Sequence, residues 1–422
     1  MSLPIPTAAR RAPGEIIPWR ILIVTLLGSA LSNMDQSLFG YAVPGVMADL
    51  GISLSGIGVL ISLSFAAAIG SASAIGPITH LLGARRVLAL CLGISAALVG
   101  LQALASTTLL FGAARVAGFA VSAAYPAVAC AYLATSTPLK RRAIALAIQQ
   151  CGYPLGWFIA SLFAAPLIAN AGWRAIFLVA FAVIPLAGFF YVALPVKSEP
   201  SSRDATRSGS SGSTLRQLLT PAFRRVSITF GLAFFLYGGA IGGTAFYLPT
   251  FFQQARGYDA KTATLVVGVS YAVGMIGYLS AALISEYWLS RRTTVVVWLC
   301  LAAAGLLAAT WLPRSSGEDI ALFGATAVFL YGSSSIMLTS LLEHFPAQLR
   351  TTAAALSGTA CISLGFVVFP IVTAAAVANY GWLLSFTFVI VPAVAAAAAL
   401  ILSLPRDAVT RILEQLGATE MA

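Results

Sequence analysis

Residues 76–86 read GPITHLLGARR, and residues 286–292 read EYWLSRR. In both places a long apolar stretch ends in a short turn that carries two adjacent arginines, and the two turns are 206 residues apart. A second pair of similar segments, NAGW at 170–173 and NYGW at 379–382, is 209 residues apart. Two pairs at nearly the same spacing indicate that one structural unit occurs twice in the chain.

Apolar residues dominate the sequence around these turns. Of 422 residues, 59% are hydrophobic and 9% are charged, with a mean hydropathy of +0.93, and a soluble domain of this composition would aggregate. Stretches of about 20 apolar residues recur, each long enough to cross a hydrocarbon core roughly 30 Å thick as a helix. We predict an all-α membrane protein with twelve spans, at roughly 19–44, 54–77, 87–105, 107–134, 143–167, 174–194, 225–249, 262–285, 293–312, 319–342, 352–377 and 381–404.

The predicted spans form two groups of six. Residues 19–194 hold the first group and residues 225–404 the second, with short cytoplasmic segments expected at 1–18 and 405–422. The segment 195–224 is rich in serine, glycine and charge, and has too little apolar surface to fold alone. We expect it to be a flexible cytoplasmic linker.

The distribution of basic residues predicts the orientation. A net charge of +11 raises the question of nucleic-acid binding, but the basic residues are dispersed among the breaks between spans. If the N-terminus is cytoplasmic, 19 of the 24 Lys and Arg residues lie inside, four lie outside, and Arg115 lies within a span. This bias predicts a multi-pass protein of the inner membrane with both termini in the cytoplasm and no nucleic-acid partner.

The sequence offers no sign of an enzyme or of a cofactor site. Its five cysteines fall within spans without metal-ligand spacing. It contains no phosphate-binding loop and no nucleotide-binding domain, so a transport activity would draw its energy from an ion gradient.

The segment 76–86 resembles the signature that major facilitator transporters carry between their second and third helices. That signature usually reads Gly, three residues, Asp, Arg, one residue, Gly, one residue and two basic residues. Gly83 permits the tight turn, and the arginines after it can reach anionic lipid headgroups. The resemblance covers nearly the whole chain and implies two six-helix halves that rock about a site near the midplane.

The same turns are candidates for conformational gating. His80 and Leu81 stand where the family has Asp and Arg, whereas Glu286 keeps an acid in the second half. The residues expected to act in gating are His80, Gly83, Arg85, Arg86, Glu286, Arg291 and Arg292.

Asp35 and Arg115 are charged residues in the interior of predicted spans. A charge inside a bilayer costs about 2.5–3.5 kcal/mol on insertion scales, so both are functional candidates. Their positions within spans 1 and 4 put them at similar depth, and helices 1 and 4 of the family line one compartment. One hypothesis is that Arg115 binds a substrate carboxylate while Asp35 takes up and releases a proton. The alternative is a purely structural ion pair.

Residues 33–44, NMDQSLFGYAVP, resemble helix 1 of the aromatic acid:proton symporters, where an Asp is followed at these spacings by Gly and Pro. Anion:cation symporters of sugar acids share the Asp and the Pro. Asn33 stands where the first group commonly has a second Asp, and Gln36 stands where the second group often has a basic residue, so neither match is complete. The side chains expected to contact substrate are Arg115, Gln36, Tyr125, Gln149, Gln150 and Tyr153.

These observations predict a proton-coupled importer of a small organic monocarboxylate, with an aromatic acid as first choice, that works by alternating access. Its partners would be the proton, the organic anion and the bilayer, and a monomer is the family default. One alternative is a proton-driven exporter of drugs or metabolites; the segment 152–156, GYPLG, counts against it, because drug:proton antiporters have Gly and Pro adjacent here. A membrane sensor on the same fold would need an added signalling domain, for which the two terminal segments are too short.

Overall fold

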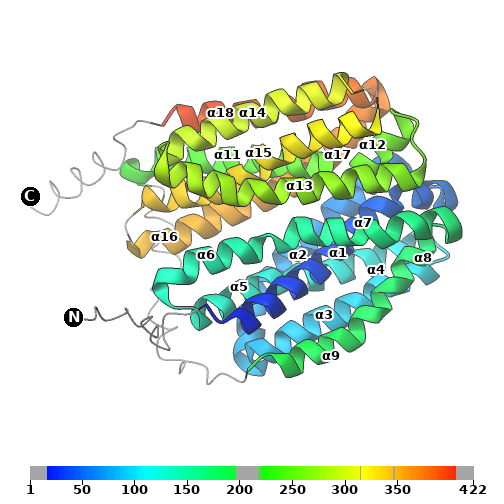
Figure 1. Ribbon diagram of the computed structural model, residues 1–422, viewed down its shortest axis with the longest axis horizontal. Helices are drawn as coiled ribbons and strands as arrows, with labels where there is room; N and C mark the ends of the chain where they lie inside the picture. The colour runs from blue at the N-terminus through cyan, green and yellow to red at the C-terminus, as the bar shows by residue number, and fades with distance from the viewer. Residues whose placement is uncertain (1–16, 196–217, 219, 314, 346, 405–422) are drawn as a thin grey trace, which may run out of the picture.

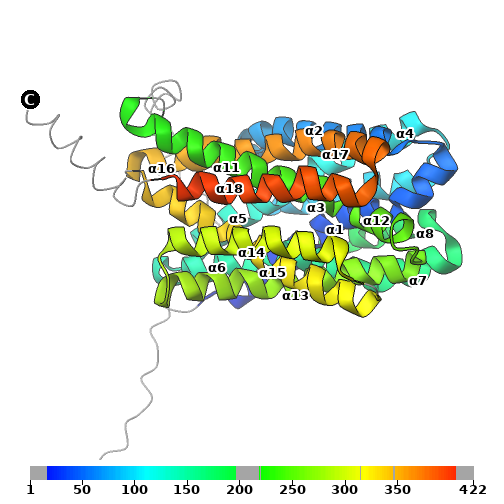
Figure 2. The ribbon, with the colours of Figure 1, turned by 90° about the horizontal axis from the view of Figure 1, so that it is seen from above.

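The computed structural model describes residues 17–195, 218, 220–313, 315–345 and 347–404. The predicted N-terminal segment, most of the linker and the predicted tail lie outside the described residues. The helices form two bundles, α1 to α9 and α11 to α18, that lie side by side with their axes along the length of the molecule (Figures 1 and 2).

The first half contains six membrane segments, three of which are interrupted. Its helices are α1 (Trp19–Leu50), α2 (Leu54–Leu82), α3 (Ala84–Leu101) with the 3₁₀ turn η1 (Gln102–Leu104), α4 (Thr108–Ser122) followed by α5 (Ala124–Ser136), α6 (Leu139–Gln150) followed by α7 (Gly152–Ala171), and α8 (Trp173–Leu178), η2 (Val179–Ala182) and α9 (Val183–Ala193). The first helix runs past the predicted end at Pro44 to Leu50, since membrane helices tolerate an internal proline.

The second half repeats this plan. Its helices are α11 (Pro221–Ala245) followed by α12 (Leu248–Gln254), α13 (Ala260–Tyr287), α14 (Arg291–Trp311), α15 (Ser316–Glu343), α16 (Ala347–Ala353) with the π-helical turn η4 (Ala354–Ala360), α17 (Cys361–Ser385), η5 (Phe386–Ile390) and α18 (Val391–Leu402).

Eleven described segments are long and apolar enough to cross a membrane, and the last of them, Ala354–Leu402, runs for 49 residues. That length is about twice what one crossing needs. The segment is broken at Gly381, whose φ of 76° is not helical, and α17 and α18 both pack on α11. It therefore makes two crossings, which gives the twelve that the sequence predicts.

The repeated Gly-Trp turns adopt the same structure in both halves. Gly172 has φ 78° and ψ 175°, close to the values of 76° and 173° at Gly381. Each following tryptophan ties the turn to the first membrane segment of its own half: Trp173 Nε1 donates to Asp49 Oδ2 (2.8 Å), and Trp382 Nε1 donates to Gln254 Oε1 (3.0 Å). The match in conformation and in partner supports the predicted duplication.

The two halves touch toward one end of the bundle. We call the end where α1 begins and α18 ends the terminal end, and the end where α1 meets α2 the loop end. Helix α2 packs on α17, and α7 packs on α13. Between the middle of the helices and the loop end, the contacts across the halves include the hydrogen bond from Ser62 Oγ to the Val367 carbonyl (2.5 Å), the stacked rings of Phe65 and Phe366 (4.5 Å) and the stacked rings of Trp157 and Tyr271 (4.6 Å between centroids).

Candidate functional site

The structure brings Asp35 of α1 and Arg115 of α4 into direct contact. Arg115 Nη1 lies 2.6 Å from Asp35 Oδ1 and 3.2 Å from the Asp35 carbonyl oxygen. The arginine side chain has no exposed surface and the aspartate is 4% exposed. The two charges therefore neutralise one another away from bulk water.

Ser122, which was not among the predicted site residues, completes the site. Its hydroxyl donates to Asp35 Oδ2 over 2.9 Å, and its carbonyl accepts a hydrogen bond from the Ser32 hydroxyl (2.6 Å). Helix α4 ends at Ser122, so the break in the fourth membrane segment lies beside the carboxylate. The available signal was spacing, because Ser122 is two helical turns beyond Arg115 and lies on the same face.

Aromatic rings cover the guanidinium. Phe39 and Phe119 lie 4.2 and 4.9 Å from the Arg115 guanidinium carbon, measured to the ring centroids, which is the range of cation–π contacts. Phe65 packs on Phe119 and Phe246 packs on Phe39, and we call these four residues the phenylalanine layer. The ion pair thus lies behind this layer, between α1 and α4 of the first half, the two helices that the family resemblance placed in one compartment.

Arg115 keeps unused hydrogen-bonding capacity. Its Nε and Nη2 are buried and have no partner among the residues that the structure describes. Buried donors of this kind are rare in proteins, because each loses its bonds to water without replacement. These two groups are the features of the site that could hold a carboxylate.

A small cavity adjoins Asp35 on the other side, between α1, α3 and the segment η2–α9. Its volume is about 20 Å³, room for about one water molecule. Its lining is mainly apolar, and Asp35 and Ser95 supply the polar groups. The carboxyl group thus has neighbouring space that does not lie between the two halves.

Two of the predicted substrate contacts bond other residues of the chain, and a third is exposed. Gln149 is buried, and its amide nitrogen donates to the Ser29 hydroxyl (2.7 Å) while its oxygen lies 2.7 Å from Cys130 Sγ. Its expected need for a partner is therefore met within the chain. Gln150 is exposed, and Gln36 donates to Asn33 Oδ1 (3.1 Å).

The two predicted tyrosines differ in their surroundings. Tyr125 is fully buried against α1, where a Cβ on Gly28 would lie 1.8 Å from its hydroxyl. Tyr153 faces the second half of the protein, with its ring 6.2 Å from Tyr271 and 6.0 Å from Tyr331. Of the two, Tyr153 is the one placed at the junction of the halves.

The predicted gating residues of the first half lie at the terminal end. Gly83 has a φ of 81° and links α2 directly to α3, as a tight turn requires. His80 and Arg86 are exposed. Arg85 stacks on the Tyr191 ring (4.0 Å to the centroid) and donates to the Tyr191 carbonyl, so it ties α3 to α9.

The predicted gating residues of the second half include one with a partner that the sequence did not predict. Arg291 forms an ion pair with Glu343 at the end of α15, and Glu286, the predicted acid of this turn, is exposed. Arg292 donates to carbonyl groups at the end of α18. The described contacts of the two arginines thus stay within the second half.

The fold, with two similar halves of six membrane segments, is that of a membrane transporter. Residues 25–361 match the Major Facilitator Superfamily, and the chain belongs to that superfamily. It is a multi-pass membrane transporter and not an enzyme.

Comparison with individual proteins supports this assignment. The chain is 26% identical over 245 residues to the cis,cis-muconate transport protein of Acinetobacter baylyi, covering 54% of this chain and little more than half (56%) of that protein. It is 24% identical over 365 residues to the gallate transporter of Pseudomonas putida, covering 79% and 80%. The predicted resemblance to transporters of aromatic and related organic acids is confirmed.

The fold is also similar to that of a solved transporter. A bacterial homologue of the human lysosomal transporter Spinster, in an inward-facing and unoccupied conformation, superposes with a TM-score of 0.67 at 16% identity over 91% of this chain and 95% of that chain. At this identity the likeness concerns the fold alone.

Proposed function

We propose that this protein imports a small organic monocarboxylate, with an aromatic acid as first choice, together with a proton. The observation that carries the proposal is the buried Asp35–Arg115 pair with two unused donors on the arginine. The relatives that are named for muconate and gallate transport support the substrate class.

The ion pair supplies a reason why the proton and the anion would move together. While Asp35 is ionised, the pair is neutral and Arg115 needs no other negative charge. Protonation of Asp35 leaves the guanidinium as an unpaired buried charge, which is costly in a low-dielectric region. A substrate carboxylate removes that cost by accepting hydrogen bonds from Arg115. Each ligand thus favours binding of the other.

The contacts between the halves suggest how access alternates. The halves are closed from the middle of the membrane to the loop end. In the predicted orientation, with both termini in the cytoplasm of an inner-membrane protein, the loop end faces outward and this state faces the cytoplasm. Uptake from outside then requires a second state in which these contacts are broken and the phenylalanine layer gives access to Arg115.

The test is uptake of labelled benzoate and 4-hydroxybenzoate into proteoliposomes with an imposed inward proton gradient. Asp35→Asn should lose gradient-driven accumulation but still exchange labelled for unlabelled acid. Arg115→Gln should lose both activities, and Arg115→Lys, which keeps the charge but not the planar fork, should raise KM. Asp49→Asn is the matched control, since it makes the same change in the same helix at an exposed site.

Three results would overturn the proposal. They are that no acid enters, that Arg115→Gln transports normally, or that Asp35→Asn still accumulates acid against a gradient. Proton-driven export of neutral or cationic compounds through wild-type protein would then favour the exporter.

A further inference from the structure

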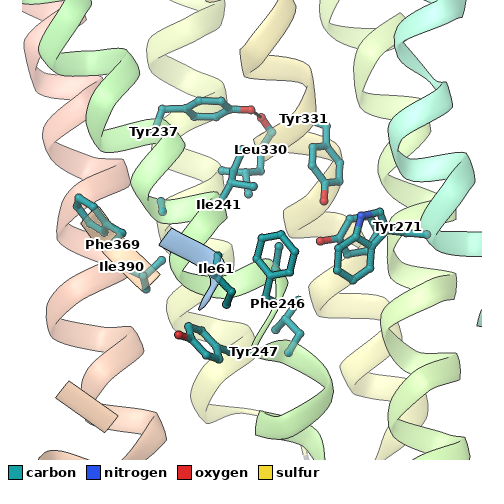
Figure 3. Packing of buried hydrophobic residues seen from close by; sticks show 14 of the residues in the cluster. Ile61, Tyr237, Ile241, Phe246, Tyr247, Tyr271, Leu330, Tyr331, Phe369 and Ile390 are labelled. Atoms are coloured by element: carbon teal, nitrogen blue, oxygen red, sulfur yellow. Dashed lines mark hydrogen bonds between the residues drawn. The ribbon is translucent and has the colours of Figure 1, made fainter. Parts of the chain in front are cut away.

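Four aromatic side chains meet at the junction of the two halves: Tyr153 and Trp157 from α7, Tyr271 from α13 and Tyr331 from α15. We call them the aromatic cluster. Trp157 and Tyr271 are stacked at 4.6 Å and 12°, and Tyr271 lies 5.5 Å from Tyr331 between ring centroids. Figure 3 shows Tyr271 and Tyr331 with their hydroxyl ends turned toward each other. Both halves therefore contribute to one surface of ring faces.

Two hydrogen-bonding groups of the cluster are left without a partner. The Tyr153 hydroxyl and the Trp157 indole nitrogen are buried, and neither makes an ordinary hydrogen bond with the described residues. The Tyr153 ring lies 6.5 Å from the Trp157 ring between centroids, so the two groups belong to neighbouring side chains of α7.

Other tyrosines in the same core are satisfied by backbone carbonyls. The hydroxyl of Tyr41 donates to Trp157 (2.9 Å), that of Tyr237 to Leu330 (2.8 Å) and that of Tyr247 to Pro370 (2.9 Å). The Trp298 indole nitrogen and the Thr250 and Thr373 hydroxyls are also buried without a partner among the described residues. Tyr153 and Trp157 differ from them in lying on neighbouring rings at the junction of the halves, where another molecule could supply the partner.

Tyr153 lies on the terminal side of the cluster and is its most exposed member. Trp157, Tyr271 and Tyr331 are buried, whereas Tyr153 is partly exposed. The contacts that close the halves lie toward the loop end, and Tyr153 precedes Trp157 by one helical turn on the terminal side. A ligand that enters between the halves from the terminal end would meet Tyr153 first.

We propose that the aromatic cluster binds the ring end of the substrate, and that Trp157 and Tyr153 recognise a polar substituent on that ring. The inference rests on the proposed function and adds residues to it. Ring faces of Tyr and Trp stack on a planar ligand, and an indole N–H can only donate. The substituent must therefore be an acceptor, such as a hydroxyl or carbonyl oxygen. The Tyr153 hydroxyl can donate a hydrogen bond to it or accept one from it.

This site is separate from the carboxylate site in the state described. Phe246 packs on Trp157 and on Phe39, and Phe39 covers Arg115, so two rings lie between the cluster and the guanidinium. A site built by both halves holds its ligand only while the halves are close. Binding of the substrate ring should therefore weaken when the contacts between the halves break during transport.

The experiment compares two acids of similar size, 4-hydroxybenzoate and 4-methylbenzoate, as substrates in proteoliposomes. Wild type should prefer the hydroxylated acid in kcat/KM. Trp157→Phe and Tyr153→Phe keep a ring but remove one polar group, and each should reduce that preference by about 3- to 10-fold. Uptake of 4-methylbenzoate should fall less than that of 4-hydroxybenzoate, because the methyl group offers no acceptor, and thermal unfolding in detergent shows whether the variants are folded. Tyr237→Phe is the matched control, because its hydroxyl already has a partner in the chain.

The outcomes separate the two proposals. If wild type takes up neither acid, the proposed function fails and this inference fails with it. If wild type transports both acids but shows no preference, or if Trp157→Phe and Tyr153→Phe keep the full preference, only the assignment of the aromatic cluster is wrong.

Discussion

The two halves join their first and fourth membrane segments in different ways. In the first half, α1 and α4 meet through the buried charges of Asp35 and Arg115. In the second half, α11 and α15 meet through a neutral hydrogen bond from the Tyr237 hydroxyl to the Leu330 carbonyl (2.8 Å), shown in Figure 3. The second half shows that this fold needs no charge at the contact. Because buried charges are costly, those of the first half call for an explanation in function.

The largest effects should come from removing the charges one at a time and then together. Arg115→Gln leaves Asp35 buried without its partner, which should lower the free energy of unfolding by about 3–5 kcal/mol, and the pair Asp35→Asn with Arg115→Gln should recover most of that loss. Uptake should nevertheless fall about 100-fold or more in all of these variants. Thermal unfolding in detergent and proteoliposome uptake measure the two quantities. If the double variant recovers both stability and uptake, the ion pair has only a structural role, like the Tyr237–Leu330 hydrogen bond in the second half.

A smaller effect is expected at Ser122, which belongs to the charged contact only through its hydroxyl. Ser122→Ala removes a hydrogen bond to the carboxylate and should cost about 1.5–3 kcal/mol of stability, with uptake about tenfold lower. Ser95→Ala, in the cavity beside the same carboxyl group, is the control, because its hydroxyl bonds the Leu92 carbonyl of its own helix. Equal effects of the two variants would mean that the bond from Ser122 has no special role.

The neutral contact of the second half should matter less. Tyr237→Phe removes one uncharged hydrogen bond, for which we expect a loss of about 0.5–1.5 kcal/mol in stability. Uptake should remain within about twofold of wild type, because the lost hydrogen bond lowers folding stability and does not contact the substrate. The same two assays apply, and a loss of uptake as large as that of Ser122→Ala would contradict the contrast between the halves.

The smallest difference should appear at the repeated Gly-Trp turns. Trp173→Phe breaks a bond to a carboxylate and Trp382→Phe breaks a bond to an amide. Asp49 is 47% exposed, so water can replace much of its bond, and the two variants should differ in stability by only about 0.5 kcal/mol. Side-by-side thermal unfolding would reveal this. A much larger gap would mean that the two turns are not equivalent.

The fold followed from the sequence because its signals are strong and local. Apolar length marks a membrane helix, and the turn at Gly83 and the break at Gly381 both have the positive φ that glycine permits. The ion pair was also predictable, since charges within spans are rare. The covering of Arg115 by Phe39 and Phe119 was not, because phenylalanine is ordinary in any apolar helix.

Partners that are distant in sequence were missed for the same reason. Gln149 bonds Ser29, which is 120 residues away, and Arg291 pairs with Glu343, which is 52 residues away. Serine occurs throughout the chain, and Arg291 lies near Glu286 in the sequence, so the sequence gives no reason to choose Ser29 or Glu343. Only packing of the helices decides these pairs.

The one-to-one pairing of Asp35 with Arg115 has a consequence for the energy that the proposed symporter can use. The empty site contains the negative charge of Asp35 and the positive charge of Arg115. The loaded site contains a protonated, neutral Asp35, the positive Arg115 and the negative carboxylate of the substrate. Both carry zero net charge across the membrane, so transport is electroneutral and the voltage does no work on either crossing. The pH gradient alone would then set the accumulation of acid, at about tenfold per pH unit.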